Sequence, residues 1–241
     1  MAALQTGIGW LAMSFFRPAL AITLISSVPL LAQSSDRAWQ EALVRADNEL
    51  KAGHFEEANR RLLKLSGAIG EKMASGSEAM YTVAVIASFR AIAAAGRHNI
   101  ADVEWYWSVA TSFFPKFKGS NLRVYGAAGE TVMGIDASRS CILQEHFPHA
   151  DIKPPKAIRN PMPRYPYHAI ETGIAERITV QVIITEAGET RCPQVVETHD
   201  DPSLAWVLLE AMKSWHFEPA TVGGKPVPVP FNQTVDFRIR Y

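Results

Sequence analysis

Hydrophobic alternation followed by a helical period, both in the last third of the chain, leaves few possible folds for that segment. In residues 178–184 apolar side chains occupy every second position, which is the period of a half-buried strand. Glu186 and Gly188 lie in a tight turn, and residues 190–198 return as a second arm, so a β-hairpin is predicted. Pro193 has no backbone N–H to donate, so we expect this arm to be bulged or to lie at a sheet edge.

An amphipathic helix is predicted after the hairpin. Asp201 offers a side-chain acceptor at the helix start, and Pro202 suits the first helical position. Apolar residues then share one helix face, and others alternate along a final strand. These residues are Leu204, Leu208, Ala211, Met212 and Trp215 on the helix, and Val235, Phe237, Ile239 and Tyr241 on the strand. With a short helix that ends at Gly173 before the hairpin, the segment is predicted to be an α+β unit with an antiparallel sheet.

Short landmarks follow one another along this segment in a fixed order. They are Pro163-x-Tyr165-Pro166, Ala169, Gly173, Gly188, Ala211-x-x-x-Trp215-x-Phe217-x-Pro219-Ala220 and Gly224-Lys225-Pro226-Val227. In this order they resemble the C-terminal domain of TonB-family proteins over residues 160–241, and several landmarks in register are more specific than one short motif. The resemblance implies a compact periplasmic domain that works by binding other proteins.

The same resemblance implies two partner-binding stretches. TonB-family proteins couple a proton-driven motor in the inner membrane to outer-membrane receptors, which they contact through the region before Tyr-Pro and through the last strand. Carried onto this sequence, the candidate binding residues are Arg159, Asn160, Met162, Arg164, Tyr165, Gln233, Thr234, Asp236, Arg238 and Arg240. A terminal strand also offers unpaired backbone groups to which an extended peptide can add. The alternative is a solvated edge whose alternating charges discourage aggregation.

The amino-terminal segment indicates export. Residues 1–32 carry a single charge, Arg17, before an apolar run that ends with a small residue ahead of Gln33, as in a secretory signal. If it is retained, the stretch 7–32 is long enough to anchor the chain in the inner membrane, although prolines interrupt it. Both alternatives place the rest of the chain in the periplasm.

A helical domain is predicted over residues 36–118. Gly53 and Gly96 are each followed, five residues later, by an alanine, Ala58 and Ala101. This resembles tetratricopeptide-type helix pairs, in which the glycine turns the first helix into the second and the alanine permits close packing. Two degenerate copies are fewer than the roughly three that a stable array needs, so one small bundle is expected.

The most apolar part of this domain is residues 80–95, where Arg90 is the one charge. Apolar residues cover more than one face, so we expect a central helix and no second membrane span. Aromatic residues follow it, namely Trp105, Tyr106, Trp107, Phe113 and Phe114. Packing against the central helix is the expected role, and a ligand pocket is the alternative.

Residues 119–159 are predicted to be a linker, because the helical pattern weakens there and prolines cluster from residue 148 onward. Cys141 lies in this stretch and Cys192 lies in the hairpin. An oxidising compartment favours a disulfide between them. Closing a loop of about 50 residues would contribute about 3 to 4 kcal/mol. Two unrelated buried thiols are the alternative.

Catalysis and cofactor binding find no support in the sequence. The chain has 24 basic and 24 acidic residues, so nothing favours nucleic acid as a partner. His146 and His149 are spaced for a metal on a helix, but Pro148 lies between them and no third ligand is evident, so no metal site is predicted. No nucleophile elbow, carboxylate pair or phosphate-binding glycine loop is present, and neither catalytic residues nor a cofactor are expected.

Two functions remain in competition. The first is a non-enzymatic periplasmic adaptor, whose TonB-like domain binds a partner by strand addition and whose helical domain binds a second protein. The second is a membrane-anchored energy transducer for TonB-dependent outer-membrane transport. Two departures count against the transducer: the apolar segment lacks the histidine of the family's motor-coupled helix, and no long Pro-Lys or Pro-Glu spacer follows it.

Overall fold

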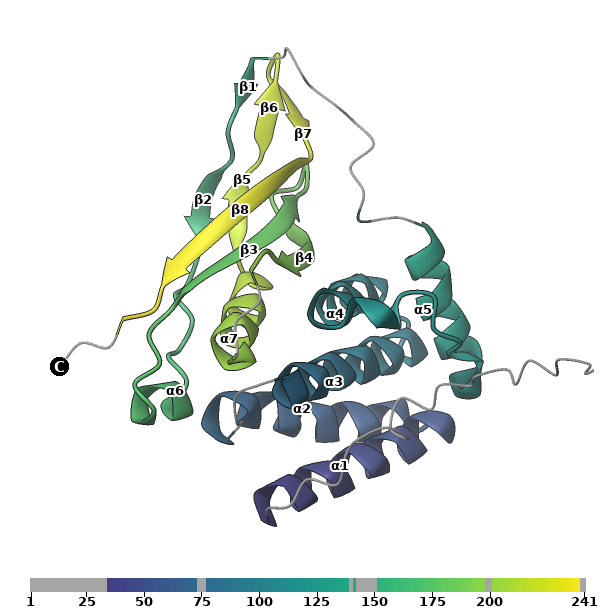
Figure 1. Ribbon diagram of the computed structural model, residues 1–241. Helices are drawn as coiled ribbons and strands as arrows, with labels where there is room; N and C mark the ends of the chain where they lie inside the picture. Colours follow the sequence, from purple (N-terminus) through teal and green to yellow (C-terminus); the bar gives the residue numbers. More distant parts are fainter. Residues whose placement is uncertain (1–33, 73–76, 139–140, 142–150, 198–200, 239–241) are drawn as a thin grey trace, which may run out of the picture.

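The computed structural model describes residues 34–72, 77–138, 141, 151–197 and 201–238. Helices make up the amino-terminal half, and small antiparallel sheets with two further helices make up the rest (Figure 1). The predicted α+β class is confirmed. The predicted signal or anchor, residues 1–32, lies outside the described residues.

The amino-terminal helices pack on one another as successive layers (Figure 1). They are α1 (Ser34–Lys51), α2 (Phe55–Lys72), α3 (Ser77–Gly96), α4 (Ile100–Phe113) and α5 (Gly126–Ser138), with the 3-10 turns η1 (Pro115–Phe117) and η2 (Arg123–Tyr125). Within the described residues, α3 is the one helix long and apolar enough to cross a membrane, but 78% of its apolar window is buried inside the fold. The predicted central helix is therefore confirmed.

The two glycines that indicated a helix repeat have different roles. Gly53 follows α1 with φ 78°, a left-handed conformation that suits glycine. Gly96 does not turn the chain, because the left-handed residue between α3 and α4 is His98, with φ 59°. A Cβ on Gly96 would lie 2.2 Å from the ring of Phe55, so this glycine makes room for packing. Ala101 is exposed, so the second copy of the expected repeat departs from the pattern.

The predicted short helix, hairpin, long helix and closing strand are all present. They are α6 (Tyr167–Glu171), β3 (Arg177–Ile184), β4 (Thr190–Val195), α7 (Pro202–Met212) and β8 (Val229–Asp236). Helix α7 ends before Trp215 and β8 ends before Phe237, both of which are predicted to belong to these elements. Ile239 and Tyr241 of the predicted strand lie outside the described residues. The strands form an antiparallel sheet in the order β4-β3-β8, and α7 packs on β3. Asp201 caps α7 by accepting the N–H of Ser203 at 2.7 Å, as the helix-start signal predicts.

Short strands extend this part of the fold. They are β1 (Ile152–Lys153), β2 (Lys156–Arg159), β5 (His216–Glu218), β6 (Ala220–Val222) and β7 (Lys225–Val227). β2 pairs with β5, and β6 pairs with both β1 and β7. Residues 152–159 of the expected linker thus join the sheets, and α5 occupies another part of that stretch. Proline-rich extended backbone has dihedral angles close to those of a strand, so it pairs when an unpaired edge lies beside it.

Strand β4 is both bulged and at a sheet edge, the two alternatives expected from Pro193. Its register with β3 shifts between Gln181 and Ile183, and Cys192 in the bulge has φ 52°. A disulfide joins Cys192 to Cys141, with 5.4 Å between the Cα atoms. The hairpin is thereby tied to the chain just after α5.

The helices and the sheets share one hydrophobic core. Helix α4 lies along β4, and α2 contacts both α6 and α7. Trp206 of α7 is 2% exposed, and its indole N–H donates to the carbonyl of Ser66 on α2 at 3.2 Å. The amino-terminal helices and the carboxyl-terminal part of the fold therefore pack directly against each other.

Candidate functional site

Strand β8 has one open side. The N–H of Phe237 donates to the carbonyl of Glu176 at 2.9 Å. This bond determines which residues of β8 form backbone hydrogen bonds to β3 and which face away from it. Hydrogen-bonded and non-bonded pairs alternate in an antiparallel ladder, so Val235 and Gln233 also face β3. The backbones of Thr234 and Asp236 then point away from it, as do those of Asn232 and Pro230. Among the described residues no strand pairs with this outer side.

The hydrogen bonds between β3 and the β4 side of the sheet support the same assignment of inward-facing and outward-facing residues. The carbonyl of Thr179, which is opposite Thr234, accepts from Val196 next to β4 and so faces away from β8. Pro230 is one of the outward-facing residues of β8, where a proline is tolerated because no ladder bond from its N–H is required.

The opposite edge of the sheet is covered by a helix. The N–H of Val195 on β4 donates to the hydroxyl of Ser112 on α4 at 2.7 Å. Arg191 of β4 also forms an ion pair with Glu104 of α4. Because α4 lies along β4, an incoming strand meets one free edge of this sheet within the described residues, that of β8.

A buried charge network holds the helical domain against α7. Arg90 of α3 is 6% exposed and pairs with Glu210 at 3.0 Å. Its guanidinium also donates to Ser66 at 3.2 Å and lies 3.8 Å from the ring centroid of Tyr106. Burial raises the pKa of Tyr106, the Glu210 charge raises it further and Arg90 opposes the shift, so the phenol stays neutral at physiological pH.

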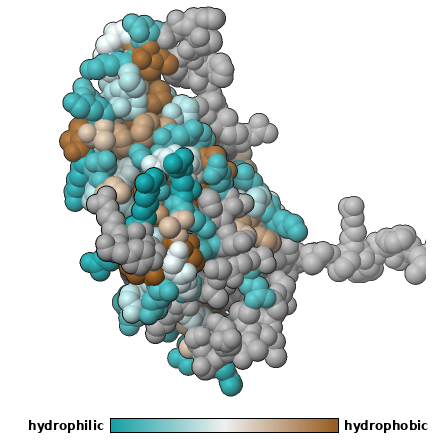
Figure 2. All heavy atoms as spheres, turned by 60° about the vertical axis from the view of Figure 1, so that its left-hand side comes forward, coloured by the Kyte–Doolittle hydropathy of each residue, from teal (hydrophilic) through white to brown (hydrophobic). Residues whose placement is uncertain are grey.

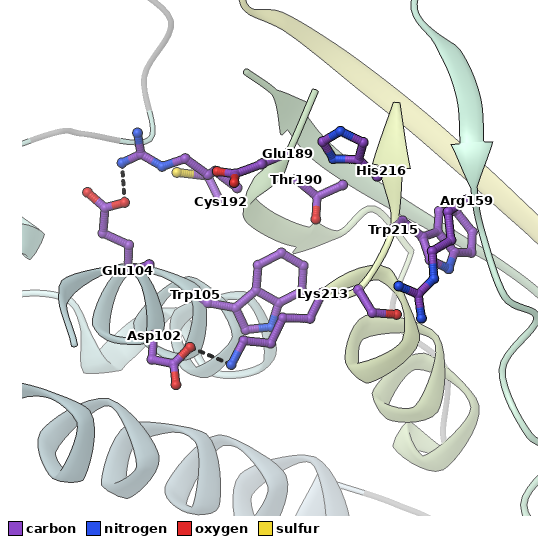
Figure 3. A pocket seen from close by; sticks show the side chains of 13 residues that line it. Asp102, Glu104, Trp105, Arg159, Glu189, Thr190, Cys192, Lys213, Trp215 and His216 are labelled. Atoms are coloured by element: carbon purple, nitrogen blue, oxygen red, sulfur yellow. Dashed lines mark hydrogen bonds and ion pairs between the residues drawn. The ribbon is translucent and has the colours of Figure 1, made fainter. Parts of the chain in front are cut away.

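A cleft of about 450 Å³ lies where α4 faces the carboxyl-terminal domain (Figure 3). Its walls come from α4, the hairpin, the end of α7, β5 and β2. Lys213 crosses from the end of α7 to Asp102 of α4, with 2.5 Å between Nζ and Oδ1, and donates to the hydroxyl of Tyr106 at 3.1 Å. The sequence contains no signal for this cleft, because its walls come from segments far apart in the chain.

Comparison with known proteins identifies the carboxyl-terminal segment. Residues 161–239 match the family described as the Gram-negative bacterial TonB protein C-terminal. This segment is a match to the TonB C-terminal family. A solution NMR structure of the Pseudomonas aeruginosa TonB CTD is 32% identical, covers 39% of this chain and 93% of that chain, and has a TM-score of 0.32. No curated protein matches the chain.

Three predicted binding residues of the TonB-like segment lie on β8 itself. Thr234 and Asp236 are exposed, and Gln233 is half-buried on the alternate face. The hydroxyls of Thr234 and Thr179 lie 3.0 Å apart. The amide of Gln233 donates to the carbonyl of Thr234 at 2.9 Å, so a side chain occupies one of the outward acceptors.

Charged residues gather where β8 ends. Arg238 is exposed and pairs with Asp236 at 2.5 Å, and Arg177 of β3 approaches the same carboxylate at 3.8 Å. The hydrogen bond from Arg238 is the main cause that lowers the pKa of Asp236. Arg240, the last predicted binding residue, lies outside the described residues.

The stretch before Tyr-Pro is divided between two places. Tyr165 lies beside the end of β8, because its ring packs edge-on against Phe237 at 5.5 Å and its hydroxyl donates to the carbonyl of Ile174 at 2.5 Å. Asn160, Met162 and Arg164 are exposed. Arg159 instead pairs with His216 in the β2–β5 ladder and lines the cleft.

Apolar side chains are exposed around the same stretch. Figure 2 brings this side of the molecule forward and shows hydrophobic residues scattered among hydrophilic ones. Ile158, Met162, Tyr167 and Ile170 are between 46% and 70% exposed. They add apolar contact area to the exposed part of the predicted binding stretch.

The described residues hold no group of three or more His, Cys, Asp or Glu that could bind a metal ion. His146 and His149 lie outside the part of the chain that the structure describes. The aromatic residues of α4 are mostly core residues, as expected: Tyr106 and Trp107 are 2% and 4% exposed. Trp105 is also buried but borders the cleft.

Proposed function

We propose that this protein is a non-enzymatic periplasmic adaptor whose TonB-like domain docks an extended segment of a partner protein by strand addition along β8. The observation that carries the proposal is the outward-facing backbone of β8, which pairs with no other strand among the described residues. An extended peptide satisfies such groups by extending the sheet. The match to the TonB C-terminal family supports a role in protein binding at the cell envelope.

The helical domain makes this docking one-sided. Helix α4 occupies the β4 edge, so β8 is the edge that a partner strand can use. We include the helical domain in the proposal as a rigid support that also offers a second protein-binding surface.

The runner-up function is a membrane-anchored energy transducer. In that role a long extended spacer connects the membrane to the binding domain. Residues 152–159, directly ahead of the TonB-like segment, instead pair with β5 and β6. This pairing favours the adaptor.

The direct test uses extended peptides selected from a displayed random library on the immobilised full-length protein. In the free protein the outward amides of Asn232, Thr234 and Asp236 should exchange rapidly with deuterium, whereas those of Gln233 and Val235 are protected by β3. A selected peptide should protect the outward amides. Protection confined to other parts of the molecule would contradict strand addition.

A matched pair of variants at one position sharpens the test. Thr234→Pro removes an outward N–H and leaves the bonds to β3, so peptide affinity should fall by about fivefold to tenfold. Thr234→Val keeps the N–H and should bind like the wild type. Gln233→Ala should bind slightly more tightly, because it frees the outward carbonyl of Thr234. Equal affinity of the proline and valine variants would exclude β8 as the docking edge.

A further inference from the structure

The cleft between α4 and the carboxyl-terminal domain is lined by two ion pairs and by two further charged residues that take part in neither pair. Lys213 is neutralised by Asp102 and Arg191 by Glu104, as the dashed lines in Figure 3 show. Glu189 and Arg159 also line the cleft. Neither forms an ion pair or a side-chain hydrogen bond among the described residues, and both are exposed.

These two charges lie at the ends of a row of three residues. Arg159 is opposite His216 in the β2–β5 ladder, and His216 forms an isolated bridge with Glu189 (Figure 3). Residues directly opposite each other on neighbouring strands project to the same face. Two strand spacings of about 4.8 Å place the backbones of Glu189 and Arg159 roughly 10 Å apart. The cleft therefore has a negative end, a positive end and an imidazole between them.

A buried donor in the same cleft has no acceptor. Trp105 is 3% exposed, and its indole N–H finds no hydrogen-bond partner among the described residues. Other indoles here are satisfied: Trp215 donates to the carbonyl of Pro161 and Trp107 to Asp136, each at 2.9 Å. Buried indole N–H groups normally have a partner, so that of Trp105 is an unsatisfied donor beside the cleft.

We propose that this cleft binds a short zwitterionic peptide of about three residues by both of its ends. The peptide ammonium pairs with Glu189, its carboxylate pairs with Arg159, and one of its carbonyls accepts from the indole of Trp105. An extended tripeptide spans about 10 Å, which is close to the separation of the two backbones that carry the charged side chains. The cleft volume of about 450 Å³ lies in the range of small-ligand sites.

This site is separate from the β8 edge of the proposed function. Its polar groups come from α4, the hairpin turn, β5 and β2, whereas a docked strand uses the outward backbone of β8. An experiment that excludes ligand binding in the cleft would therefore leave the proposed docking at β8 unaffected, and the reverse also holds.

Isothermal titration calorimetry with tri-alanine on the full-length protein tests the proposal. Free tri-alanine should bind, and N-acetylated or C-amidated tri-alanine should bind about tenfold more weakly, because each lacks one charge-assisted contact. Absence of binding up to about 10 mM peptide overturns the proposal, as does equal affinity for the free and blocked peptides.

Variants of the two charged residues, Glu189 and Arg159 (the rim variants), should change which blocked peptide binds more weakly, and misfolding would not produce such a selective change. Glu189→Gln should bind free and acetylated tri-alanine equally, while it still discriminates against the amide. Arg159→Gln should show the reverse pattern. Trp105→Phe should weaken all three peptides alike. Unchanged discrimination in both rim variants, or peptide-induced amide shifts at β8 in place of the cleft, would reject the site.

Discussion

The backbone N–H of Val195 donates to the hydroxyl of Ser112 across the boundary between the sheet and helix α4, at 2.7 Å. This bond satisfies a backbone donor at the β4 edge of the sheet. The helical domain therefore covers the β4 edge of the sheet and leaves the β8 edge open.

The ion pair between Arg90 and Glu210 should contribute measurably to stability. Glu210→Gln leaves a buried guanidinium without its carboxylate, so the free energy of unfolding should fall by about 2 kcal/mol. Glu56→Gln removes the exposed partner of Arg97 and should cost less than about 1 kcal/mol. Urea denaturation measures both. Equal losses would show that burial does not set the strength of the Arg90 pair.

The disulfide should stabilise the fold by restricting the unfolded chain. Changing Cys141 and Cys192 together to alanine removes a cross-link between positions that are 51 residues apart in the sequence. The expected loss is about 3 to 4 kcal/mol. Reductant should lower the urea midpoint of the wild type to that of the double variant and leave the variant unchanged. An unaltered wild-type midpoint would contradict this account.

The turn at Gly188 should tolerate no side chain. It has φ 78°, and a Cβ there would lie 1.8 Å from the carbonyl oxygen of Phe217. Gly188→Ala should therefore destabilise the protein by about 2 to 3 kcal/mol. Gly223→Ala is the matched control, because that residue has φ 56° but an open surrounding, and about 1 kcal/mol is expected. Similar melting temperatures for the two variants would exclude the close contact as the cause.

Stability should decline in alkaline solution because of two buried tyrosines. Burial is the main cause that raises the pKa values of Tyr106 and Tyr125, and Asp47 adds to the shift at Tyr125. Above pH 10 the unfolded chain releases these phenolic protons and the folded chain keeps them. The unfolded state then binds fewer protons, so the free energy of unfolding falls as pH rises.

The slope identifies the groups responsible. Each tyrosine should contribute about 1.4 kcal/mol per pH unit above its unfolded pKa of about 10. Urea midpoints measured between about pH 9 and pH 11 should fall less steeply in Tyr106→Phe and in Tyr125→Phe than in the wild type. An identical slope in all three proteins would assign the alkaline loss to other groups.

Local features of the sequence determined most of the carboxyl-terminal fold. Alternation in residues 178–184 predicts β3, and Asp201 followed by Pro202 predicts the start of α7. The missing N–H of Pro193 predicts an irregular edge strand, which is β4. These predictions succeed because strand period, helix caps and proline geometry are set by a few neighbouring residues.

Contacts between distant segments decided the rest. No local pattern shows that Ser112 covers β4, that residues 152–159 pair with β5 and β6, or that Glu189, His216 and Arg159 form one row. Each depends on bringing together backbone groups far apart in the chain, and which groups meet depends on how the helices and sheets pack around the shared core. The sequence alone thus determined the elements and the class of the fold, whereas the tertiary structure decided which edge stays open and where the cleft forms.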